Sequence, residues 1–337
     1  MLPIALALLP VSAFLLILVL LDSFKLVATG TLARALLAGA ATALVAGFIH
    51  AHLLETLDVQ MLTRYVAPVT EEALKAIAFF VVVRRRPVGF LVDAGILGFA
   101  VGTGFAVVEN IEYLRALGSQ SLWLWSTRGF GTAMLHGTTT AIVAVLAKSR
   151  FDRGMGGVAR AVAPGLAIAI GLHGAFNQAL VSPLLAAATL MTLLPLAAFV
   201  VFDRSERATR EWFGRGMDRD VELLNALLSS NFGQTPRGRY LRELTSRFPG
   251  PVVADMFCLL RLQSELAIRA KGLVMAREAG FTLPLTDLAP RLEEVRYLQR
   301  SIGATGRLAL RPLQHDGRDQ WHRTLLEAAG TRSRRSS

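Results

Sequence analysis

A small set of polar side chains interrupts otherwise apolar stretches of the chain. Its members are of the types that activate water or stabilise developing charge: Glu71, Glu72, Lys75, Glu109, His136, His173 and Asn177. A carboxylate can take a proton from a water molecule near a carbonyl group, and imidazole or amide N–H groups can stabilise the oxyanion that forms. Two adjacent glutamates beside a lysine, together with two histidines, therefore favour hydrolysis by an activated water.

The stretches that carry these residues have the composition of a membrane protein. Of the 337 residues 53% are hydrophobic and 18% are charged, and the mean hydropathy is +0.46. A soluble domain carries about 25% charged residues, and a spanning helix needs about 20 mostly apolar ones. We expect an all-α polytopic membrane protein with about seven transmembrane helices, near residues 2–22, 33–54, 66–83, 91–110, 129–148, 161–181 and 184–202. The third is the least apolar, because Glu71, Glu72 and Lys75 interrupt it.

The charge density changes abruptly near residue 203. Residues 1–202 hold 13 Lys and Arg against 9 Asp and Glu, whereas residues 203–337 hold 23 against 16. We therefore expect a transmembrane domain over 1–202 and a helical, basic cytoplasmic domain over 203–337. Apolar periodicity in the second part predicts helices near 218–228, 251–279, 288–302 and 318–329. Its charges alternate in sign, which favours solvated helix faces over a nucleic-acid surface, and membrane lipids or a cytoplasmic partner are the expected contacts.

Basic residues also predict the orientation. They gather after the third span, between the fifth and sixth, and after the seventh: Arg84, Arg85, Arg86, Lys148, Arg150, Arg153, Arg160, Arg204, Arg207 and Arg210. The opposite loops carry only Arg64, Arg115 and Arg128. Because Lys and Arg concentrate on the cytoplasmic side, we expect an outside N-terminus and a cytoplasmic tail. The polar residues of spans three to six then share one depth in the outer half of the membrane, with His173 and Asn177 on one helix face.

Other uses of the same residues are less favoured. No HExxH motif occurs, and the expected site uses no cofactor. A zinc ion held by His136, His173 and a glutamate is the alternative to that expectation. A proton-coupled transporter is a second function for the same buried groups, although it would be expected to show inverted repeats, and we find none. A catalytically silent scaffold or immunity protein is a third.

Four blocks in order carry a resemblance to a known family. The segment from Pro68 to Lys75 is similar to the P-x-x-E-E-x-x-K motif of the PrsW family of bacterial intramembrane proteases. Residues 93–110, which are glycine-rich and end in Glu109-Asn110, resemble the second block. His136-Gly-Thr-Thr-Thr and His173-Gly-Ala-Phe-Asn177 resemble the third and fourth. The wider superfamily includes type II CAAX prenyl proteases and bacteriocin-immunity proteins.

The resemblance covers about residues 30–202 and implies a glutamic-type endopeptidase of the bacterial plasma membrane with a signalling role. In the family pattern Glu71 and Glu72 activate water, His136 and His173 activate water or stabilise the oxyanion, and Asn177 supports the oxyanion. Lys75, Glu109 and Asn110 take supporting positions. The implied substrate is a single-span membrane protein, such as an anti-sigma factor, cut at its outer side. Nothing in residues 203–337 resembles the family.

Structural roles compete with these assignments. Glu71 and Lys75 alone could form an ion pair that holds a helix in the bundle, and a lone membrane histidine is commonly a helix–helix hydrogen-bond donor. Glu109 and Asn110 could cap the outer end of their span. Gly98 and Gly102 form a small-xxx-small pattern typical of close helix packing. His50, His52, His315 and His322 carry no case for a functional role.

Overall fold

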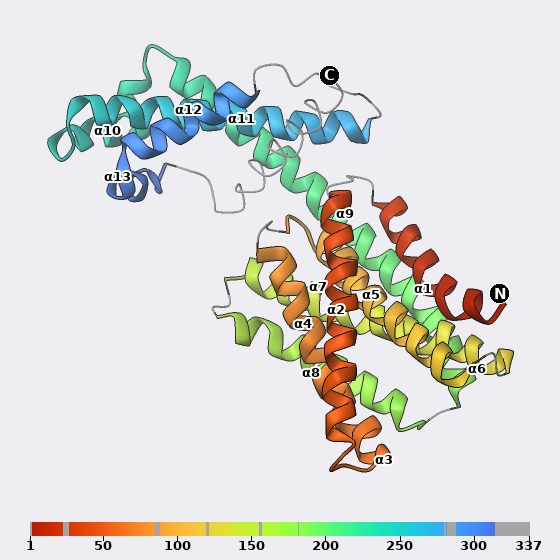
Figure 1. Cartoon of the computed structure of the whole chain (residues 1–337). Coiled ribbons are helices and arrows are strands. Elements are labelled where there is room, and N and C mark those ends of the chain that lie inside the picture. The colour runs from red at the N-terminus through yellow and green to blue at the C-terminus, as the bar shows by residue number, and fades with distance from the viewer. Residues whose placement is uncertain are drawn as a thin grey trace. The chain divides into compact units, whose positions relative to one another are not determined.

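A computed structural model describes residues 2–22, 27–84, 88–118, 121–154, 157–180, 182–279, 281 and 288–313. Every regular element in these ranges is a helix (Figure 1). The chain divides into two compact units, Met1–Glu206 and Arg207–Ser337. We call them the membrane unit and the tail unit and describe each by itself.

The membrane unit is a bundle of long helices. It contains α1 (Leu2–Leu21), α2 (Thr29–Leu53), α4 (Ala67–Arg84), α5 (Leu91–Leu117), α7 (Met134–Asp152), α8 (Val158–Asn177) and the first part of α9 (Pro183–Leu228). Short elements precede α4 and α7: α3 (Val59–Met61) with the π-helical turn η1 (Leu62–Val66), and α6 (Leu122–Thr127) with the π-helical turn η2 (Arg128–Ala133). The helices that carry the predicted glutamate pair and the first predicted histidine, α4 and α7, thus each follow a π-helical turn.

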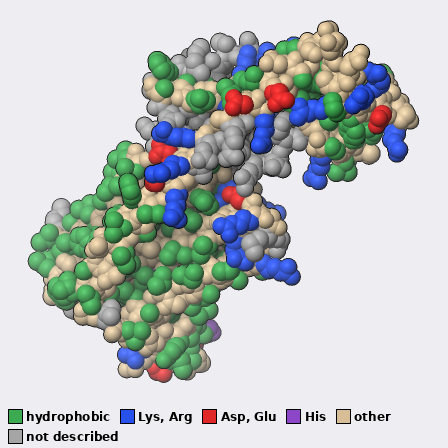
Figure 2. All heavy atoms as spheres, turned by 180° about the vertical axis from the view of Figure 1, so that it is seen from behind, with side chains coloured by type: hydrophobic (Ala, Val, Ile, Leu, Met, Phe, Trp, Pro, Cys, Tyr) green, Lys and Arg blue, Asp and Glu red, His purple; other side chains and the backbone are tan. Residues whose placement is uncertain are grey.

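Six described segments are long and apolar enough to cross a membrane: Leu2–Leu21, Thr29–Leu53, Leu91–Leu117, Leu122–Asp152, Val158–Asn177 and Leu184–Arg207. The polytopic all-α prediction is therefore confirmed. The third predicted span, 66–83, exists as α4 within a residue of its predicted ends, but its charged residues keep it outside the six. It packs in the same bundle, against α2, α5, α7 and α8. Figure 2 shows hydrophobic side chains covering most of the visible face of the membrane unit.

Helix α5 is the centre of the bundle and contacts α1, α2, α4 and α7. Its glycines allow this, because a Cβ at Gly102 would lie 2.1 Å from the carbonyl oxygen of His136. On another side of α5, a Cβ at Gly104 would lie 2.0 Å from the carbonyl oxygen of Leu36. The close packing predicted from Gly98 and Gly102 is thus present, and it places the backbone of α7 directly on α5.

Two findings in the tail unit differ from the sequence expectations. Helix α9 continues without interruption to Leu228, so no helix ends at residue 202. Besides α11 (Gly250–Glu278) and α12 (Leu288–Ser301), which match predicted helices, the unit contains α10 (Pro236–Glu243) and α13 (Gly303–Leu310), which were not predicted. The turns η3 (Phe232–Gln234) and η4 (Leu244–Ser246) flank α10. The helix predicted near 318–329 lies outside the described residues.

The tail unit has its own hydrophobic core. Helices α9, α10, α11, α12 and α13 contribute buried residues to one cluster, which includes Leu227, Leu241, Met256, Leu259, Val295 and Leu310. A buried ion pair also joins α9 to α11, with Lys271 Nζ 2.6 Å from Asp220 Oδ2. Burial of apolar area of this kind is the main stabilising contribution to a helical domain.

Candidate active site

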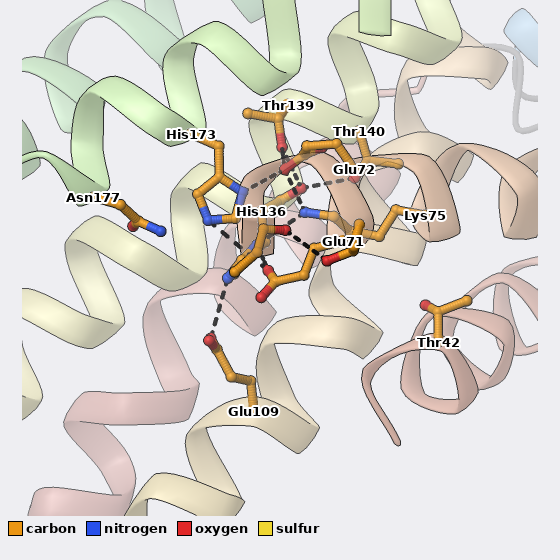
Figure 3. A network of polar contacts seen from close by, with 12 residues as sticks. Thr42, Glu71, Glu72, Lys75, Glu109, His136, Thr139, Thr140, His173 and Asn177 are labelled. Atoms are coloured by element: carbon orange, nitrogen blue, oxygen red, sulfur yellow. Dashed lines mark hydrogen bonds and ion pairs between the residues drawn. The ribbon is translucent and has the colours of Figure 1, made fainter. Parts of the chain in front are cut away.

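A cluster of polar residues lies inside the membrane unit, where α4, α5, α7 and α8 meet (Figure 3). We call it the polar cluster and define it by its members: Glu71, Glu72 and Lys75 on α4, Glu109 on α5, His136 and Thr139 on α7, and His173 on α8. All but Glu109 are buried, and the side chain of Glu109 is 19% exposed. Six of the predicted site residues are therefore in one place, although their catalytic roles stay predictions.

Glu72 is the most firmly held member. Its Oε1 atom is 2.6 Å from Lys75 Nζ, 2.9 Å from His173 Nδ1 and 3.1 Å from Thr139 Oγ1. A carboxylate only accepts hydrogen bonds, so all three neighbours donate to it. Neutral His173 then carries its hydrogen on Nδ1 and has its lone pair on Nε2. Glu72 thus fixes the orientation of His173, as a carboxylate does in many catalytic histidine pairs.

Lys75 connects this part of the polar cluster to His136. Its Nζ atom is 2.9 Å from His136 Nδ1 and lies 4.9 Å from the centre of the Phe105 ring. An ammonium group has no lone pair, so Lys75 donates and His136 accepts at Nδ1. The hydrogen of His136 is then on Nε2, which lies 3.1 Å from Glu109 Oε2. Lys75 and Glu109 together therefore determine the tautomer of His136.

Glu71 is held far more loosely than Glu72, its neighbour in sequence. Its Oε2 atom is buried and has no hydrogen-bond partner. It faces two imidazoles, 4.0 Å from His136 Nδ1 and 3.9 Å from His173 Nε2. These distances exceed a direct hydrogen bond. Glu72 Oε2 is likewise buried without a partner, so what distinguishes Glu71 is that its Oε2 faces both histidines at distances that a water molecule or a cation can bridge.

His50 is a neighbour of Glu71 that the sequence analysis set aside. It lies in α2, with Nδ1 3.9 Å from Glu71 Oε1 and Nε2 2.7 Å from Thr70 Oγ1. The structure therefore places His50 against the polar cluster, whereas His52 is exposed. The signal in the sequence was a histidine inside the second apolar stretch, but nothing local showed which way its side chain points.

Arg128 was expected in a loop between two spans, but it lies in η2. Its side chain is only 13% exposed and lies 3.1 Å from Glu109 Oε2 through Nη2. Its Nε donates to Asn110 Oδ1 at 3.0 Å, and its guanidinium carbon lies 3.6 Å from the centre of the Tyr113 ring. Asn110 in turn donates to the carbonyl oxygen of Ala7 at 2.7 Å. Asn110 therefore links α5 to α1 and η2, and Arg128 supports Glu109 from outside the polar cluster.

Asn177 lies beside the polar cluster rather than in it. Its Nδ2 donates to the carbonyl oxygen of Thr63 at 2.8 Å, which joins the end of α8 to η1. Figure 3 shows its side chain on the His173 side of the cluster, with no contact drawn to the glutamates. The oxyanion role predicted for Asn177 stays a prediction.

Comparison with protein families identifies the fold that carries this geometry. The model of the PrsW family of intramembrane metalloproteases matches residues 25–202, which include every member of the polar cluster. The chain belongs to the PrsW family. Comparisons with curated proteins and with solved structures gave no match. Membership supports an intramembrane protease function for the PrsW-like unit, in agreement with the resemblance read from its four blocks.

The family description includes a metal, and three residues of the polar cluster have the donor types for one. Ligand atoms of Glu71, His136 and His173 lie within 4.8 Å of one another, and two histidines with one glutamate form a common catalytic zinc set. The unpartnered Oε2 of Glu71 and the carboxylates behind both histidines fit such a site, since metal-bound histidines are usually backed by a carboxylate. Lys75 competes with it, because its ammonium uses the lone pair of His136 Nδ1.

Proposed function

We propose that this chain is an intramembrane endopeptidase of glutamic type, which cuts single-span membrane proteins with a water activated by Glu71. The observation that carries the proposal is the pair of acceptors Glu71 Oε2 and His173 Nε2, which face each other at 3.9 Å. One water molecule can donate a hydrogen bond to each of two acceptors at this separation. We assign Glu71 rather than Glu72 as the base, because Glu71 Oε2 faces both imidazoles without a direct hydrogen bond, whereas Glu72 is held by three hydrogen bonds to its Oε1.

In the proposed reaction Glu71 accepts a proton as the water oxygen bonds to the peptide carbonyl carbon. The carbonyl oxygen becomes an oxyanion, for which the amide of Asn177 is the proposed donor. His173 Nε2 accepts a hydrogen bond from the attacking water, and His136, whose two nitrogens face Lys75 and Glu109, lines the site. The C–N bond then breaks, and the proton passes from Glu71 to the leaving nitrogen. Glu72 and Lys75 hold His173 and His136 in place, and Glu109 with Arg128 supports His136 from its other side.

A second candidate is the same hydrolysis with a divalent cation held by Glu71, His136 and His173, as their donor types and spacing support. A zinc ion bound there would polarise the peptide carbonyl and acidify a bound water. We place this candidate second, because Lys75 would first have to leave His136 Nδ1.

The test uses the full chain in liposomes with a panel of single-span peptides, each with a fluorophore and a quencher on either side of its outer juxtamembrane segment. We expect wild type to cut at least one peptide and Glu71→Gln to lower the rate by about 10²- to 10⁴-fold, the usual contribution of a general base. The matched control is Glu55→Gln, since the Glu55 side chain is 69% exposed at the end of α2. Full cleavage by Glu71→Gln would overturn the assignment of Glu71 as the base. No cleavage of any panel peptide by wild type would overturn the protease proposal and favour a transporter or silent scaffold.

The metal candidate has a test of its own that does not use cleavage. We expect the purified chain to bind less than one equivalent of zinc or cobalt, and its cleavage rate to be unchanged after exhaustive chelation. One equivalent of cobalt, with the absorption of a tetrahedral nitrogen and oxygen site that His173→Ala abolishes, would reverse the order of the two candidates.

The remaining proposals concern substrate, place and tail. We propose a substrate cut in the outer half of the bacterial plasma membrane, with the N-terminus of the protease outside. The tail of residues 203–337 is proposed as a cytoplasmic domain that contacts lipids or a protein partner and no nucleic acid. The basic residues that predict this orientation support it. Cysteines placed at 118 and 155 test it: labelling of position 155 by an impermeant reagent added outside intact cells would contradict it.

A further inference from the structure

His50 is turned toward the polar cluster from a helix that carries none of its members. It lies near the end of α2, and its side chain is 16% exposed, whereas that of His52, two residues later, is 77% exposed. Each ring nitrogen of His50 faces a different residue of α4. Nε2 is 2.7 Å from Thr70 Oγ1 and Nδ1 is 3.9 Å from Glu71 Oε1.

The surroundings of Thr70 assign the hydrogen of His50. The Thr70 hydroxyl lies 3.1 Å from the carbonyl oxygens of Val66 and Ala67, the usual acceptors for a threonine inside a helix. A hydroxyl has one hydrogen, so when that hydrogen goes to the helix its oxygen is left to accept. His50 then donates from Nε2 to Thr70 and has its lone pair on Nδ1, which is directed at Glu71.

The two oxygens of Glu71 therefore face different imidazoles. Oε1 faces His50, while Oε2 faces His136 and His173. The 3.9 Å between His50 Nδ1 and Glu71 Oε1 is too long for a direct hydrogen bond and fits one water donating to both atoms. A carboxylate that is fixed at one oxygen cannot rotate freely about its Cγ–Cδ bond, so the direction of its other oxygen is fixed as well.

We propose that His50 is a positioning residue of the protease site: its Nδ1 holds the Oε1 edge of Glu71 and so directs Oε2, the atom assigned as the base. This inference rests on the function proposed above. It adds a residue of α2 to the site. The four sequence blocks lie on other helices and do not suggest this. A purely structural role is the competing account, in which His50 only fastens α2 to α4 through Thr70.

Two substitutions separate the roles of the two nitrogens. Glutamine places an amide near the position of Nε2 and keeps a donor for Thr70, but has no atom near Nδ1. Asparagine places its amide near the position of Nδ1, facing Glu71, and does not reach Thr70. A positioning role therefore predicts that asparagine rescues the activity and glutamine does not, and a fastening role predicts the reverse. Thr70→Val removes the fastening contact alone.

The experiment measures kcat and KM of the full chain in liposomes, with the panel peptide that wild type cuts. We expect His50→Gln to lower kcat by about 10- to 100-fold with little change in KM, as misdirected catalytic groups do. His50→Asn and Thr70→Val should each retain most of the wild-type kcat. His52→Gln is the matched control, since it makes the same change on the exposed neighbour.

A wild-type kcat in His50→Gln would overturn the inference. If His50→Asn and Thr70→Val then lose kcat, His50 only fastens α2 to α4. Either result leaves the proposed function intact as long as Glu71→Gln stays inactive. Cleavage by Glu71→Gln would instead remove the assignment of Glu71 as the base and this inference together.

Discussion

Each unit of the chain contains one buried lysine paired with a carboxylate, at the same distance. In the membrane unit Lys75 Nζ lies 2.6 Å from Glu72 Oε1, and in the tail unit Lys271 Nζ lies 2.6 Å from Asp220 Oδ2. Both lysines are at most 1% exposed. The two pairs would be indistinguishable in a list of ion pairs, but what surrounds them differs.

Around Lys75 and Glu72, polar groups from three further helices converge, and the adjacent Glu71 has a buried oxygen without a partner. Among the described residues, the buried side-chain nitrogen and oxygen atoms without a partner all belong to the membrane unit. The pair in the tail lies between α9 and α11, with Lys271 packed closely over Gly216. Two of these atoms, Oε2 of Glu71 and Oε2 of Glu72, lie at the membrane pair. Buried atoms left without partners are costly, so we interpret this pair as part of a candidate reactive site and the tail pair as a structural contact.

The largest predicted effect separates the two pairs directly. Lys75→Met and Lys271→Met each leave a buried carboxylate without its cation, which costs about 3–5 kcal/mol of folding stability. We expect each loss to appear in its own unit, as faster hydrogen exchange of α4 and α7 for Lys75→Met and of α9 and α11 for Lys271→Met. Only Lys75→Met should abolish cleavage of the panel peptide.

Double variants sharpen this result. Replacing both members of a buried pair by apolar residues is often neutral or stabilising, so Asp220→Leu with Lys271→Met should recover most of the stability that Lys271→Met loses. Glu72→Leu with Lys75→Met should recover stability in the same way but no cleavage, because His173 and His136 lose the groups that orient them. Cleavage by this second double variant would show that the pair in the membrane unit is as structural as the one in the tail.

Most of the membrane unit and of the polar cluster could be predicted from the sequence, because both follow from position along a helix. Apolar length predicted the long helices, and the position of each polar residue along its span predicted one common layer for Glu71, Glu109, His136 and His173. Helix α4 is less apolar than the other spans because it carries three members of the polar cluster. Its glutamates and lysine remove the composition that marks the other spans.

The contacts that could not be predicted are those that depend on which side of its helix a residue lies. His50 and Arg128 reach Glu71 and Glu109 only because α2 packs on α4 and η2 lies beside α5, and no local pattern encodes those rotations. The missed helix α10 did have a local signal, since Thr235 caps it and Pro236 is its first residue. The short α13 begins at Gly303, which has a φ of 66° and interrupts the apolar period.

A smaller effect tests whether the polar cluster depends on close packing at a glycine. In the tail, a Cβ at Gly216 would lie 2.7 Å from Lys271 Nζ. Gly102→Ala would place a methyl group 2.1 Å from the carbonyl oxygen of His136, so α7 must shift. Overpacking of this kind costs about 1–3 kcal/mol, and we expect a matching fall in thermal stability together with slower cleavage. Gly171→Ala on α8 is the control, because a Cβ there meets nothing within 4 Å. Equal behaviour of the two variants would contradict the argument.

The smallest effect concerns the single hydrogen bond from Thr139 to Glu72. Thr139 and Thr140 are adjacent on α7, and both hydroxyls lie near the carbonyl oxygen of His136, at 3.2 and 2.9 Å. Only Thr139 also contacts Glu72 Oε1. Thr139→Val should therefore cost about 1.5–3 kcal/mol, the range for a hydrogen bond to a charged group, and Thr140→Val about 0.5–1.5 kcal/mol. Because Glu72 orients His173, only Thr139→Val should also reduce kcat. Equal losses of kcat in the two variants would mean that Thr139 does not act through Glu72.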